Sequence, residues 1–386
     1  MTADSRWTRR DFLSTTALGI IGMGISGSSV GADERFAYIG TYTNTGHSDG
    51  IYRLFLNTTT GAMRVDGVAA KSADPSFLAL HPNGRVLYVV NELESFDGKP
   101  TGAVSAFAIA RESGALTPLN QLPSHGKAPC YVSVDRTGHT VLVANYVSGT
   151  IATFTVRQDG GLGEARTIVH HEGKGPDPER QEGPHAHCII TDPANRYAIA
   201  ADLGVDGVLT YRFNEKTGAI STPANAVATN RGAGPRHLAF HSTGRFLYVI
   251  NELDSTLVVY KYDGDRGALE QVQVTAASPG GTAKNYPADL HVASSGRFLY
   301  GSNRGDNTIA MFAIDPASGQ LTAMQQVSTG GDWPRNFAFD PTGGFLLVAN
   351  QRSDSILSFR VDGESGRLTP TGEKVQLPSP VCIRFR

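Results

Sequence analysis

Short runs in which apolar and polar residues alternate recur along this chain, and Gly, Asn, Asp or Pro bound each run. Residues 234–252, GPRHLAFHSTGRFLYVINE, contain two such runs on either side of the turn-forming residues Ser242, Thr243 and Gly244. Valine, isoleucine, tyrosine and phenylalanine are frequent in these runs, which is typical of β-strands. The pattern therefore predicts pairs of short antiparallel strands joined by tight glycine turns.

The same two-strand phrase occurs six times, and its second strand always ends at Asn or Asp. The copies span residues 74–92, 128–146, 183–203, 234–252, 286–304 and 333–351. The closing residues are Asn91, Asn145, Asp202, Asn251, Asn303 and Asn350. We expect these side chains to hydrogen-bond local backbone groups. They recur at intervals of about 50 residues, and such a period indicates a repeat architecture.

Each copy continues into a third strand, a turn that contains Gly and a more polar fourth strand, and four antiparallel strands form one blade of a β-propeller. The two ends of the chain supply a further unit. Residues 35–43, 50–57 and 63–70 are predicted as its second, third and fourth strands, and residues 378–386 as its first. The sequence therefore predicts one all-β domain over residues 33–386, a seven-bladed β-propeller whose ring is closed by the C-terminal strand.

The first 32 residues form a different kind of sequence. Arg9 and Arg10 precede Phe12, Leu13 and a Gly-rich apolar run that ends in small residues. This segment resembles a twin-arginine export signal, and a basic tail without a targeting role is the alternative. We therefore assign residues 1–32 to a signal peptide that the twin-arginine export machinery recognises, and we expect the mature protein to be periplasmic or secreted.

Composition narrows the partners of the mature chain. Lys and Arg total 34 against 36 Asp and Glu, the formal net charge is −2, and 18% of the residues are charged. No basic excess or charged run indicates nucleic acid or a membrane surface as a partner. Cys130, Cys188 and Cys382 are scattered through apolar runs, so we expect small buried side chains rather than disulfides, nucleophiles or metal ligands.

A propeller of this kind gathers polar side chains at one end of its central channel. The first and second strands of a blade are antiparallel, so the residues that begin the first strand and those that follow the second share one face. His81 and His241 belong to the turns at the other face and are expected to be structural. The polar residues expected at the shared face are His185, His187, Arg236, His237, Glu252, Asp289, His291, Arg304 and Arg335, with Glu92 and Gln351 as further candidates.

Several of these residues stand in motifs: GPRH…FH…G…LYV.NE from 234, HxH…DP from 185, ADLH…GR.LY.SNR from 288 and PR.F from 334. With these motifs the mature chain resembles the seven-bladed lactonase propeller family, which includes propeller-type 6-phosphogluconolactonases and carboxy-cis,cis-muconate cyclase. The resemblance implies a catalytic set of one His, two Arg and one Glu, which fall on His187, Arg236, Arg304 and Glu252. The remaining residues of the shared face are candidates for substrate binding: His185, His237, Asp289, His291 and Arg335.

The implied reaction is the opening of a lactone by water through a tetrahedral oxyanion, which guanidinium groups stabilise. We expect no serine nucleophile and hence no covalent acyl-enzyme, and no metal or other cofactor, which leaves general acid–base catalysis. Glu252 between two arginines is expected to stay ionised and to orient or deprotonate the water. His187, with an ordinary pKa near ~6.5, is expected to pass a proton to the departing ring oxygen.

Three functions stay open on the sequence. The first is a hydrolase of a small lactone, either 6-phosphogluconolactone or an unphosphorylated sugar aldonolactone. The second is a lactonising cyclase of the muconate type, and the third is a non-enzymatic propeller that binds a sugar acid or a protein at the same face. An export signal favours an unphosphorylated lactone, because phosphorylated sugars are cytoplasmic metabolites.

Overall fold

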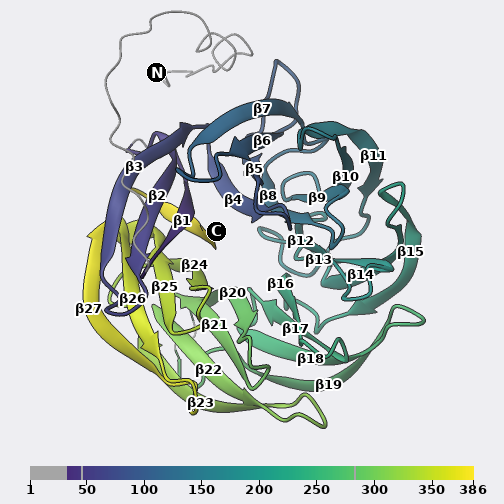
Figure 1. Ribbon diagram of the computed structural model, residues 1–386. Coiled ribbons are helices and arrows are strands. Elements are labelled where there is room, and N and C mark those ends of the chain that lie inside the picture. The colour runs from purple at the N-terminus through teal and green to yellow at the C-terminus, as the bar shows by residue number, and fades with distance from the viewer. Residues whose placement is uncertain (1–32, 45–46, 282–283) are drawn as a thin grey trace, which may run out of the picture.

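Seven four-stranded antiparallel sheets stand around a common axis (Figure 1). The computed structural model describes residues 33–44, 47–281 and 284–386. The predicted all-β, seven-bladed propeller is confirmed, and within those residues no helix is long and apolar enough to cross a membrane. The signal peptide predicted at residues 1–32 lies outside the described residues.

We number the sheets as blades in chain order and name the inner strand of each blade first. Blade 1 contains β28 (Pro380–Phe385), β1 (Glu34–Thr41), β2 (Gly50–Asn57) and β3 (Met63–Lys71). Blade 2 contains β4 (Pro75–Leu80), β5 (Val86–Asn91), β6 (Ala103–Ile109) and β7 (Leu116–Pro123). Blade 3 contains β8 (Pro129–Val134), β9 (Thr140–Asn145), β10 (Thr150–Val156) and β11 (Leu162–His170).

The other four blades follow the same order along the chain. Blade 4 contains β12 (Ala186–Thr191), β13 (Tyr197–Asp202), β14 (Gly207–Asn214) and β15 (Ala219–Ala228). Blade 5 contains β16 (Pro235–Phe240), β17 (Phe246–Asn251), β18 (Thr256–Asp263) and β19 (Ala268–Ala276). Blade 6 contains β20 (Tyr286–Val292), β21 (Phe298–Arg304), β22 (Thr308–Ile314) and β23 (Leu321–Ser328). Blade 7 contains β24 (Pro334–Phe339), β25 (Phe345–Asn350), the 3-10 helix η2 (Gln351–Ser353), β26 (Ser355–Val361) and β27 (Leu368–Gln376).

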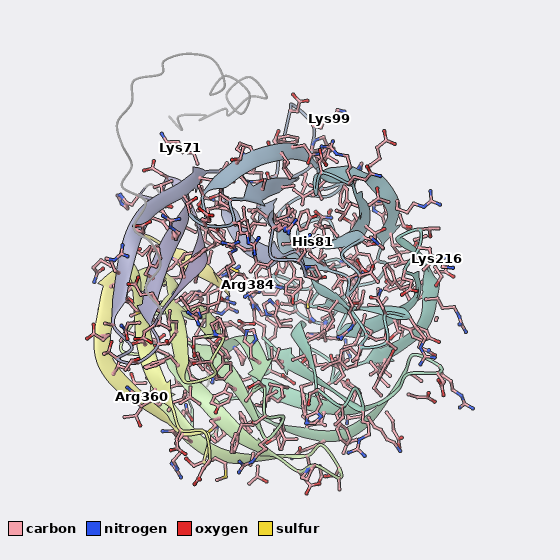
Figure 2. All side chains as sticks on the ribbon, in the orientation of Figure 1. Lys71, His81, Lys99, Lys216, Arg360 and Arg384 are labelled. Atoms are coloured by element: carbon pink, nitrogen blue, oxygen red, sulfur yellow. The ribbon has the colours of Figure 1, made fainter. Side chains whose placement is uncertain are left out.

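The ring closes where the last strand joins the first blade. β28 pairs antiparallel with β1, and Ile383 stands opposite Ile39. Arg384 donates a hydrogen bond across to the carbonyl oxygen of Leu78 in blade 2, so β28 also contacts the next blade. In Figure 2, Arg384 lies near the centre of the ring, whereas Lys216 lies at its outer edge. The predicted closure of the ring by the C-terminal strand is confirmed.

At each junction between two blades, a turn glycine lies in close contact with the neighbouring blade. This glycine lies in the turn between the third and fourth strands of its blade. It packs against a residue at the start of the second strand of the preceding blade. At all seven positions the φ angle is between +65° and +85°, and an added Cβ would come within 2.8 Å of that neighbour. These contacts are Phe36 with Gly114, Val86 with Gly160, Thr140 with Gly218, Tyr197 with Gly267, Phe246 with Gly319, Phe298 with Gly366 and Phe345 with Gly61.

The Asn or Asp that closes the second strand of blades 2 to 7 is buried, and five of these six side chains hydrogen-bond nearby backbone groups, as predicted. The exception is Asn251, whose amide donates to the hydroxyl of Thr256 at 2.8 Å. In blade 2 the side-chain amide of Asn91 donates to the carbonyl oxygen of Ala73 at 2.6 Å. In blade 4 one carboxylate oxygen of Asp202 accepts the backbone N–H of His185 at 2.7 Å. These residues therefore fix the connections at the face where the inner strands begin.

The expected structural residues also take the expected places. Nε2 of His81 donates to the carbonyl oxygen of Gly138 at 3.0 Å, and Nε2 of His241 donates to that of Gly296 at 2.8 Å. Both bonds join a turn to the turn of the following blade, which confirms a structural role at the face opposite the predicted site. The three cysteines, Cys130, Cys188 and Cys382, are buried and free, as predicted.

The glycine contact that joins blades 7 and 1 gives a test of ring closure. We expect Gly61→Ala to destabilise the protein by about 1–3 kcal/mol more than Gly372→Ala, because its Cβ would meet the ring of Phe345. The two glycines share a φ of +85°, but nothing lies within 4 Å of a Cβ at Gly372, so backbone strain is matched and only the clash differs. Urea unfolding of both variants measures the difference, and equal midpoints would show that this junction does not limit stability.

Candidate active site

Every inner strand carries one extra residue near its start, opposite a shorter stretch of the second strand. Such a β-bulge turns a side chain out of the regular alternation of the strand. We define the face at which the inner strands begin as the site face. The seven bulges form a bulge ring at this face, made of Val381, Ser76, Cys130, His187, Arg236, Ala288 with Asp289, and Arg335.

The second strand of every blade ends at an Asn, Asp or Thr, and the residue directly after it contributes to a second ring of side chains. This rim ring lies at the same face, because first and second strands are antiparallel. Its members, in blade order, are Tyr42, Glu92, Tyr146, Leu203, Glu252, Arg304 and Gln351. The two rings bring three of the four residues of the expected catalytic set into direct contact.

Glu252 is the centre of that contact, and three arginines reach its carboxylate. Nε of Arg236 and Nη2 of Arg304 donate to Oε2 at 3.0 and 2.6 Å. Nη2 of Arg180, from the connection between β11 and β12, donates to Oε1 at 2.6 Å. Arg236, Arg304 and Glu252 are each no more than 5% exposed, so the charges are held in a medium that screens them poorly.

The arginines decide the charge of this cluster. Burial alone would raise the pKa of Glu252, but Arg304, Arg236 and Arg180 together hold it well below its ordinary value. Burial lowers the pKa of Arg304 to about 9, which leaves the guanidinium charged at neutral pH. The expectation that Glu252 stays ionised between two arginines is confirmed, and Arg180 adds a third.

A chain of hydrogen bonds extends from Arg236 to blade 7. Nη1 of Arg236 donates to Nε2 of His237 at 3.2 Å, so His237 carries its proton on Nδ1 and donates it to Asp289 at 2.8 Å. Asp289 also accepts from Nε2 of His291 at 3.0 Å and from the side-chain amide of Asn336. Burial, together with Arg236, lowers the pKa of His237 to about 3, so the ring is neutral at neutral pH.

His187 lies beside this chain without a direct partner at Nδ1. The side chain is buried, and Nδ1 has no hydrogen-bond partner among the described residues. Its ring centroid is 5.3 Å from that of His237 and 5.6 Å from that of Tyr146. Burial and Arg236 hold the pKa of His187 well below its ordinary value. The expectation of an ordinary pKa near ~6.5 is therefore wrong, and the imidazole is neutral at neutral pH.

Blades 1, 2 and 7 supply a separate group at the same face. The hydroxyl of Tyr42 donates to Oε2 of Glu92 at 2.9 Å. The guanidinium of Arg335 lies 5.3 Å from the centre of the Tyr42 ring. Although burial opposes its charge, Tyr42, Glu92 and Glu252 raise the pKa of Arg335. Arg335 thus interacts with both glutamates of the site face.

Comparison with known proteins identifies the family. A family described as "Lactonase, 7-bladed beta-propeller" matches residues 36–385. The chain belongs to this lactonase propeller family. The 6-phosphogluconolactonase of Bacillus subtilis (strain 168) is 40% identical to it over 289 residues, which are 75% of this chain and 80% of that protein.

Solved structures resemble this lactonase propeller over nearly its whole length. A putative 6-phosphogluconolactonase from Bacteroides fragilis has a TM-score of 0.85 at 35% identity and covers 92% of this chain and 98% of its own. A periplasmic gluconolactonase from Pseudomonas aeruginosa has a TM-score of 0.85 at 35% identity and covers 91% of this chain and 99% of its own.

The other candidate residues of the lactonase propeller spread around the same face. The ring of His185 stacks on Tyr146 with centroids 4.6 Å apart, and its Nε2 lies 3.3 Å from the carboxylate of Glu182. His291 is about one-third exposed, and Arg335 is also partly exposed. Gln351 belongs to the rim ring, but its Oε1 is buried without a hydrogen-bond partner among the described residues.

Sequence reasoning missed four residues that contact the site. Tyr42 and Tyr146 follow the end of a second strand, so the rule that selected Glu252 also covered them. Asn336 directly follows Arg335, and its amide role depends on Asp289 from another blade. Arg180 lies in an irregular connection with no repeat pattern, and no sequence signal identified it. The missed residues are Tyr42, Tyr146, Arg180 and Asn336.

One serine stands in a pattern that is shared with nucleophilic hydrolases. Ser48 is the central residue of a Gly-x-Ser-x-Gly match at residues 46–50. Such a nucleophile normally sits at a sharp turn from a strand into a helix. Here Ser48 lies between β1 and β2, and its hydroxyl hydrogen-bonds that of Thr41 at 2.5 Å. The local structure is therefore unlike a nucleophile elbow.

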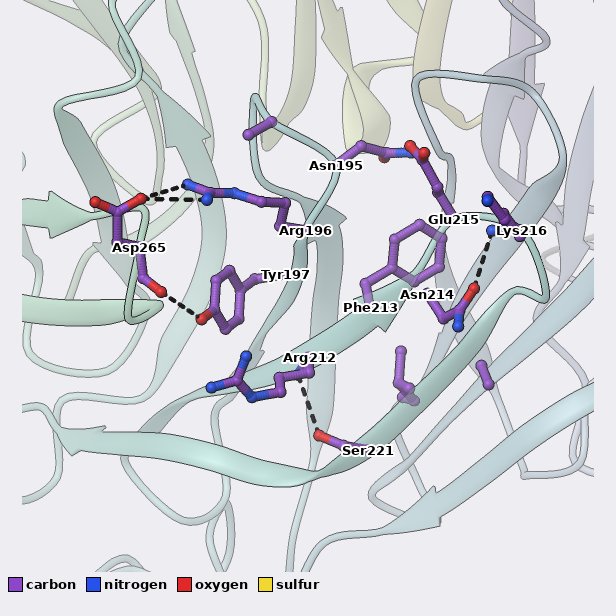
Figure 3. A pocket seen from close by; sticks show the side chains of 13 residues that line it. Asn195, Arg196, Tyr197, Arg212, Phe213, Asn214, Glu215, Lys216, Ser221 and Asp265 are labelled. Carbon is purple, nitrogen blue, oxygen red and sulfur yellow. Dashed lines mark hydrogen bonds and ion pairs between the residues drawn. The ribbon is translucent and has the colours of Figure 1, made fainter.

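A hollow of about 810 Å³ lies away from the site face, between the turns of blades 4 and 5 (Figure 3). Arg196, Arg212 and Lys216 are among the side chains that line it. Arg196 is paired with Asp265 at 3.2 Å, and both are exposed. The lining contains none of the predicted site residues, so the hollow is separate from the candidate active site.

The neutral buried histidines predict how stability depends on pH. The folded pKa values of His187 and His237 are lowered, whereas an unfolded histidine titrates near ~6.5. Below that pH the unfolded state binds more protons, so we expect the free energy of unfolding to fall between pH ~6.5 and ~5 by up to about 1.4 kcal/mol per pH unit for each histidine.

Urea unfolding at pH 7, 6 and 5 measures this slope. We expect His187→Gln to remove the contribution of one histidine to the pH dependence of the free energy of unfolding, because glutamine does not titrate. The matched control is His139→Gln, which changes an exposed histidine. A parent protein whose stability is constant over this interval would contradict the neutral state of the buried rings.

Proposed function

We propose that the chain is a lactone hydrolase that opens sugar lactones, of the kind named 6-phosphogluconolactonase or gluconolactonase. Membership of the lactonase propeller family and the names of similar proteins support this function. The observation that carries the proposal is the cluster at Glu252. Its carboxylate aligns three guanidinium groups at the face where His187 presents a neutral imidazole.

The charge of the site face supports an anionic ligand. Four guanidinium groups meet there, from Arg180, Arg236, Arg304 and Arg335. The carboxylates beside them are those of Glu252, Asp289 and Glu92, so positive charge is in excess even when all three are ionised. Arginine binds carboxylate and phosphate through paired hydrogen bonds. The excess suits the oxyanion of the reaction, the carboxylate of the product or a phosphate on the substrate.

In the proposed reaction, water attacks the carbonyl carbon of the lactone and a tetrahedral oxyanion forms. Arg236 and Arg304 stabilise the oxyanion, and Glu252 keeps both guanidiniums in place. His187 accepts the proton of the water, because its imidazole is neutral. The bond to the ring oxygen then breaks with its electron pair on that oxygen, which takes up one proton to become a hydroxyl group while the carbonyl carbon becomes that of a carboxylic acid. His187 returns its proton before the next turnover.

This mechanism changes two roles that the sequence had indicated. The lowered pKa of His187 keeps its imidazole neutral at neutral pH, with one ring nitrogen free to accept a proton, so it first takes a proton from water rather than stores one for the ring oxygen. Both carboxylate oxygens of Glu252 accept hydrogen bonds from arginines, so Glu252 orients the arginines rather than deprotonates water. Among the proposed substrate-binding residues, His291 and Arg335 are partly exposed and can contact a ligand. The polar atoms of His185, His237 and Asp289 are engaged by other residues of the protein, so these three residues act through their partners.

Removal of one oxyanion donor tests the function. We expect the mature parent protein to hydrolyse glucono-δ-lactone, its 6-phosphate or both, and Arg304→Ala to lower kcat by about 10²–10³-fold. Arg367→Ala, which changes an exposed arginine outside the site, is the matched control. A pH-stat assay over both lactones and a muconolactone separates the hydrolase from a lactonising cyclase. A parent without turnover on any of them, or an Arg304→Ala variant with parental turnover, would reject the proposal.

We further propose that residues 1–32 direct export and that the enzyme acts in the periplasm or outside the cell. The Arg9–Arg10 pair supports this location, as does the similarity to a periplasmic gluconolactonase. In that compartment the substrate would be an unphosphorylated aldonolactone.

A change of the arginine pair tests the location. We expect replacement of both Arg9 and Arg10 by Lys to leave the protein in the cytoplasm, because the export machinery reads the guanidinium pair. Cell fractionation and immunoblotting measure the distribution, with Arg64→Lys as a control outside the segment. Equal export of the parent and the double variant would show that the segment is not a twin-arginine signal.

A further inference from the structure

Two copies of the repeat end in the same tripeptide. Asn-Glu-Leu occurs at residues 91–93 in blade 2 and at residues 251–253 in blade 5. Glu92 and Glu252 therefore hold equivalent positions in the rim ring. Blades 2 and 5 are three places apart, which is the largest separation in a ring of seven. The site face thus carries two equivalent carboxyl groups on opposite sides.

Contacts from neighbouring blades fix the position of Glu92. Its backbone N–H donates to the carbonyl oxygen of Asp74 at 3.0 Å. The hydroxyl of Tyr42 donates to Oε2 at 2.9 Å, and the backbone N–H of Thr43 donates to the carboxylate of Asp74 at 2.8 Å. Tyr42 therefore occupies Oε2 as a donor, and a proton on the carboxyl group of Glu92 belongs on Oε1.

The surroundings of the two glutamates differ. Three arginines bond directly to Glu252, whereas the charged or titratable groups around Glu92 are Tyr42, Arg335, Asp74 and Cys130. Burial raises the pKa of Glu92, and Arg335 together with Ser76 and Tyr42 offsets only part of that effect. Two carboxyl groups whose pKa values are moved apart are the usual arrangement of an acid and an ionised partner in one site.

The proposed hydrolysis needs such an acid. The departing ring oxygen is an alkoxide unless it receives a proton as the bond breaks. Glu252 is held ionised by its arginines and has no proton to give. His187 is neutral before the reaction and holds only the proton that it takes from the attacking water, so a separate acid would give the attack of water and the opening of the ring each its own proton carrier. The remaining carboxyl group of the rim ring is that of Glu92.

We propose that Glu92, held by Tyr42 on the side of the site face opposite Glu252, is the acid that protonates the departing ring oxygen of the lactone. This assignment rests on the proposed function. As the bond between the carbonyl carbon and the ring oxygen breaks, its electron pair stays on the oxygen. The carboxyl proton of Glu92 then forms the O–H bond of the new hydroxyl, and Glu92 becomes a carboxylate. Solvent returns a proton to Glu92, and His187 releases to solvent the proton that it took from water.

Arg335 is placed to assist this step. Its guanidinium lies against the ring of Tyr42 and interacts with both Glu92 and Glu252. The negative charge that appears on Glu92 as the proton leaves is therefore formed next to a cation. Arg335 is a positioning residue in this proposal, and Tyr42 fixes which carboxyl oxygen donates.

The dependence on the leaving group tests the assignment. Glu92→Gln keeps an acceptor for Tyr42 but has no proton to donate. We expect it to lower kcat on glucono-δ-lactone, whose leaving group is an alcohol, by about 10²–10⁴-fold. An aryl lactone releases a phenol, whose pKa is ~10 like that of tyrosine, so its leaving group departs with little need of protonation. The kcat of Glu92→Gln on that lactone should therefore fall less than about tenfold. The variant should also lose the basic limb of the kcat–pH profile.

Glu94→Gln, two residues along the chain and exposed, is the matched control and should behave like the parent on both lactones. An equal loss on the two lactones would show that Glu92 supports the fold or the binding of substrate rather than proton transfer. Parental turnover of Glu92→Gln would remove Glu92 from the reaction. A parent that hydrolyses neither lactone would instead overturn the proposed function.

An infrared titration tests the proton on Glu92 without any turnover. At a pH at which Glu94 is ionised, the difference spectrum between the parent and Glu94→Gln should contain only carboxylate bands. At the same pH, the difference spectrum between the parent and Glu92→Gln should contain the band of a protonated carboxyl group. Absence of that band would overturn the assignment, whatever the outcome of the kinetic measurements.

Discussion

The pairing of β28 with β1 is the interaction on which the site depends, because it brings blade 7 against blade 1. The guanidinium of Arg335 in blade 7 reaches the ring of Tyr42 in blade 1 only across this junction. The backbone N–H of Ile383 in β28 donates to Asn336 at 2.7 Å, and Asn336 in turn donates to Asp289 in blade 6. The closing strand therefore completes the sheet of the first blade and also supports the hydrogen bonds of the site face.

Charge at the site face is organised around one buried carboxylate. Taking Glu252 and its arginines out of water is costly, and removal of one partner from such a buried pair typically costs about 3–5 kcal/mol. The cluster keeps positive charge in excess, because three guanidiniums meet one carboxylate. A bound anion would supply the charge that the protein leaves uncompensated. The same arrangement therefore accounts for the buried arginines and for the proposed anionic substrate.

The bulges connect the regular fold to this chemistry. An uninterrupted strand alternates its side chains between the two faces of the sheet, so neighbouring residues point apart. One extra residue at the start of each inner strand breaks that alternation at His187, Arg236 and Arg335. Every blade of the propeller thus has one bulge position. In blades 4, 5 and 7 this position holds a His or an Arg of the site, whereas in blades 2 and 3 it holds Ser76 and Cys130.

The sequence by itself determined the repeat, the seven blades, the closing strand and the face at which the polar residues lie. These features are local, because strand alternation, turn glycines and a strand-closing Asn or Asp are each set within one repeat. Only the tertiary structure decided which residues of different blades meet. It placed Arg180 on Glu252, made His187 neutral and gave Glu92 and Glu252 opposite pKa shifts from the same tripeptide. Ion pairs and pKa values depend on distances through space and on burial, and a repeat does not record how its copies are arranged around the ring.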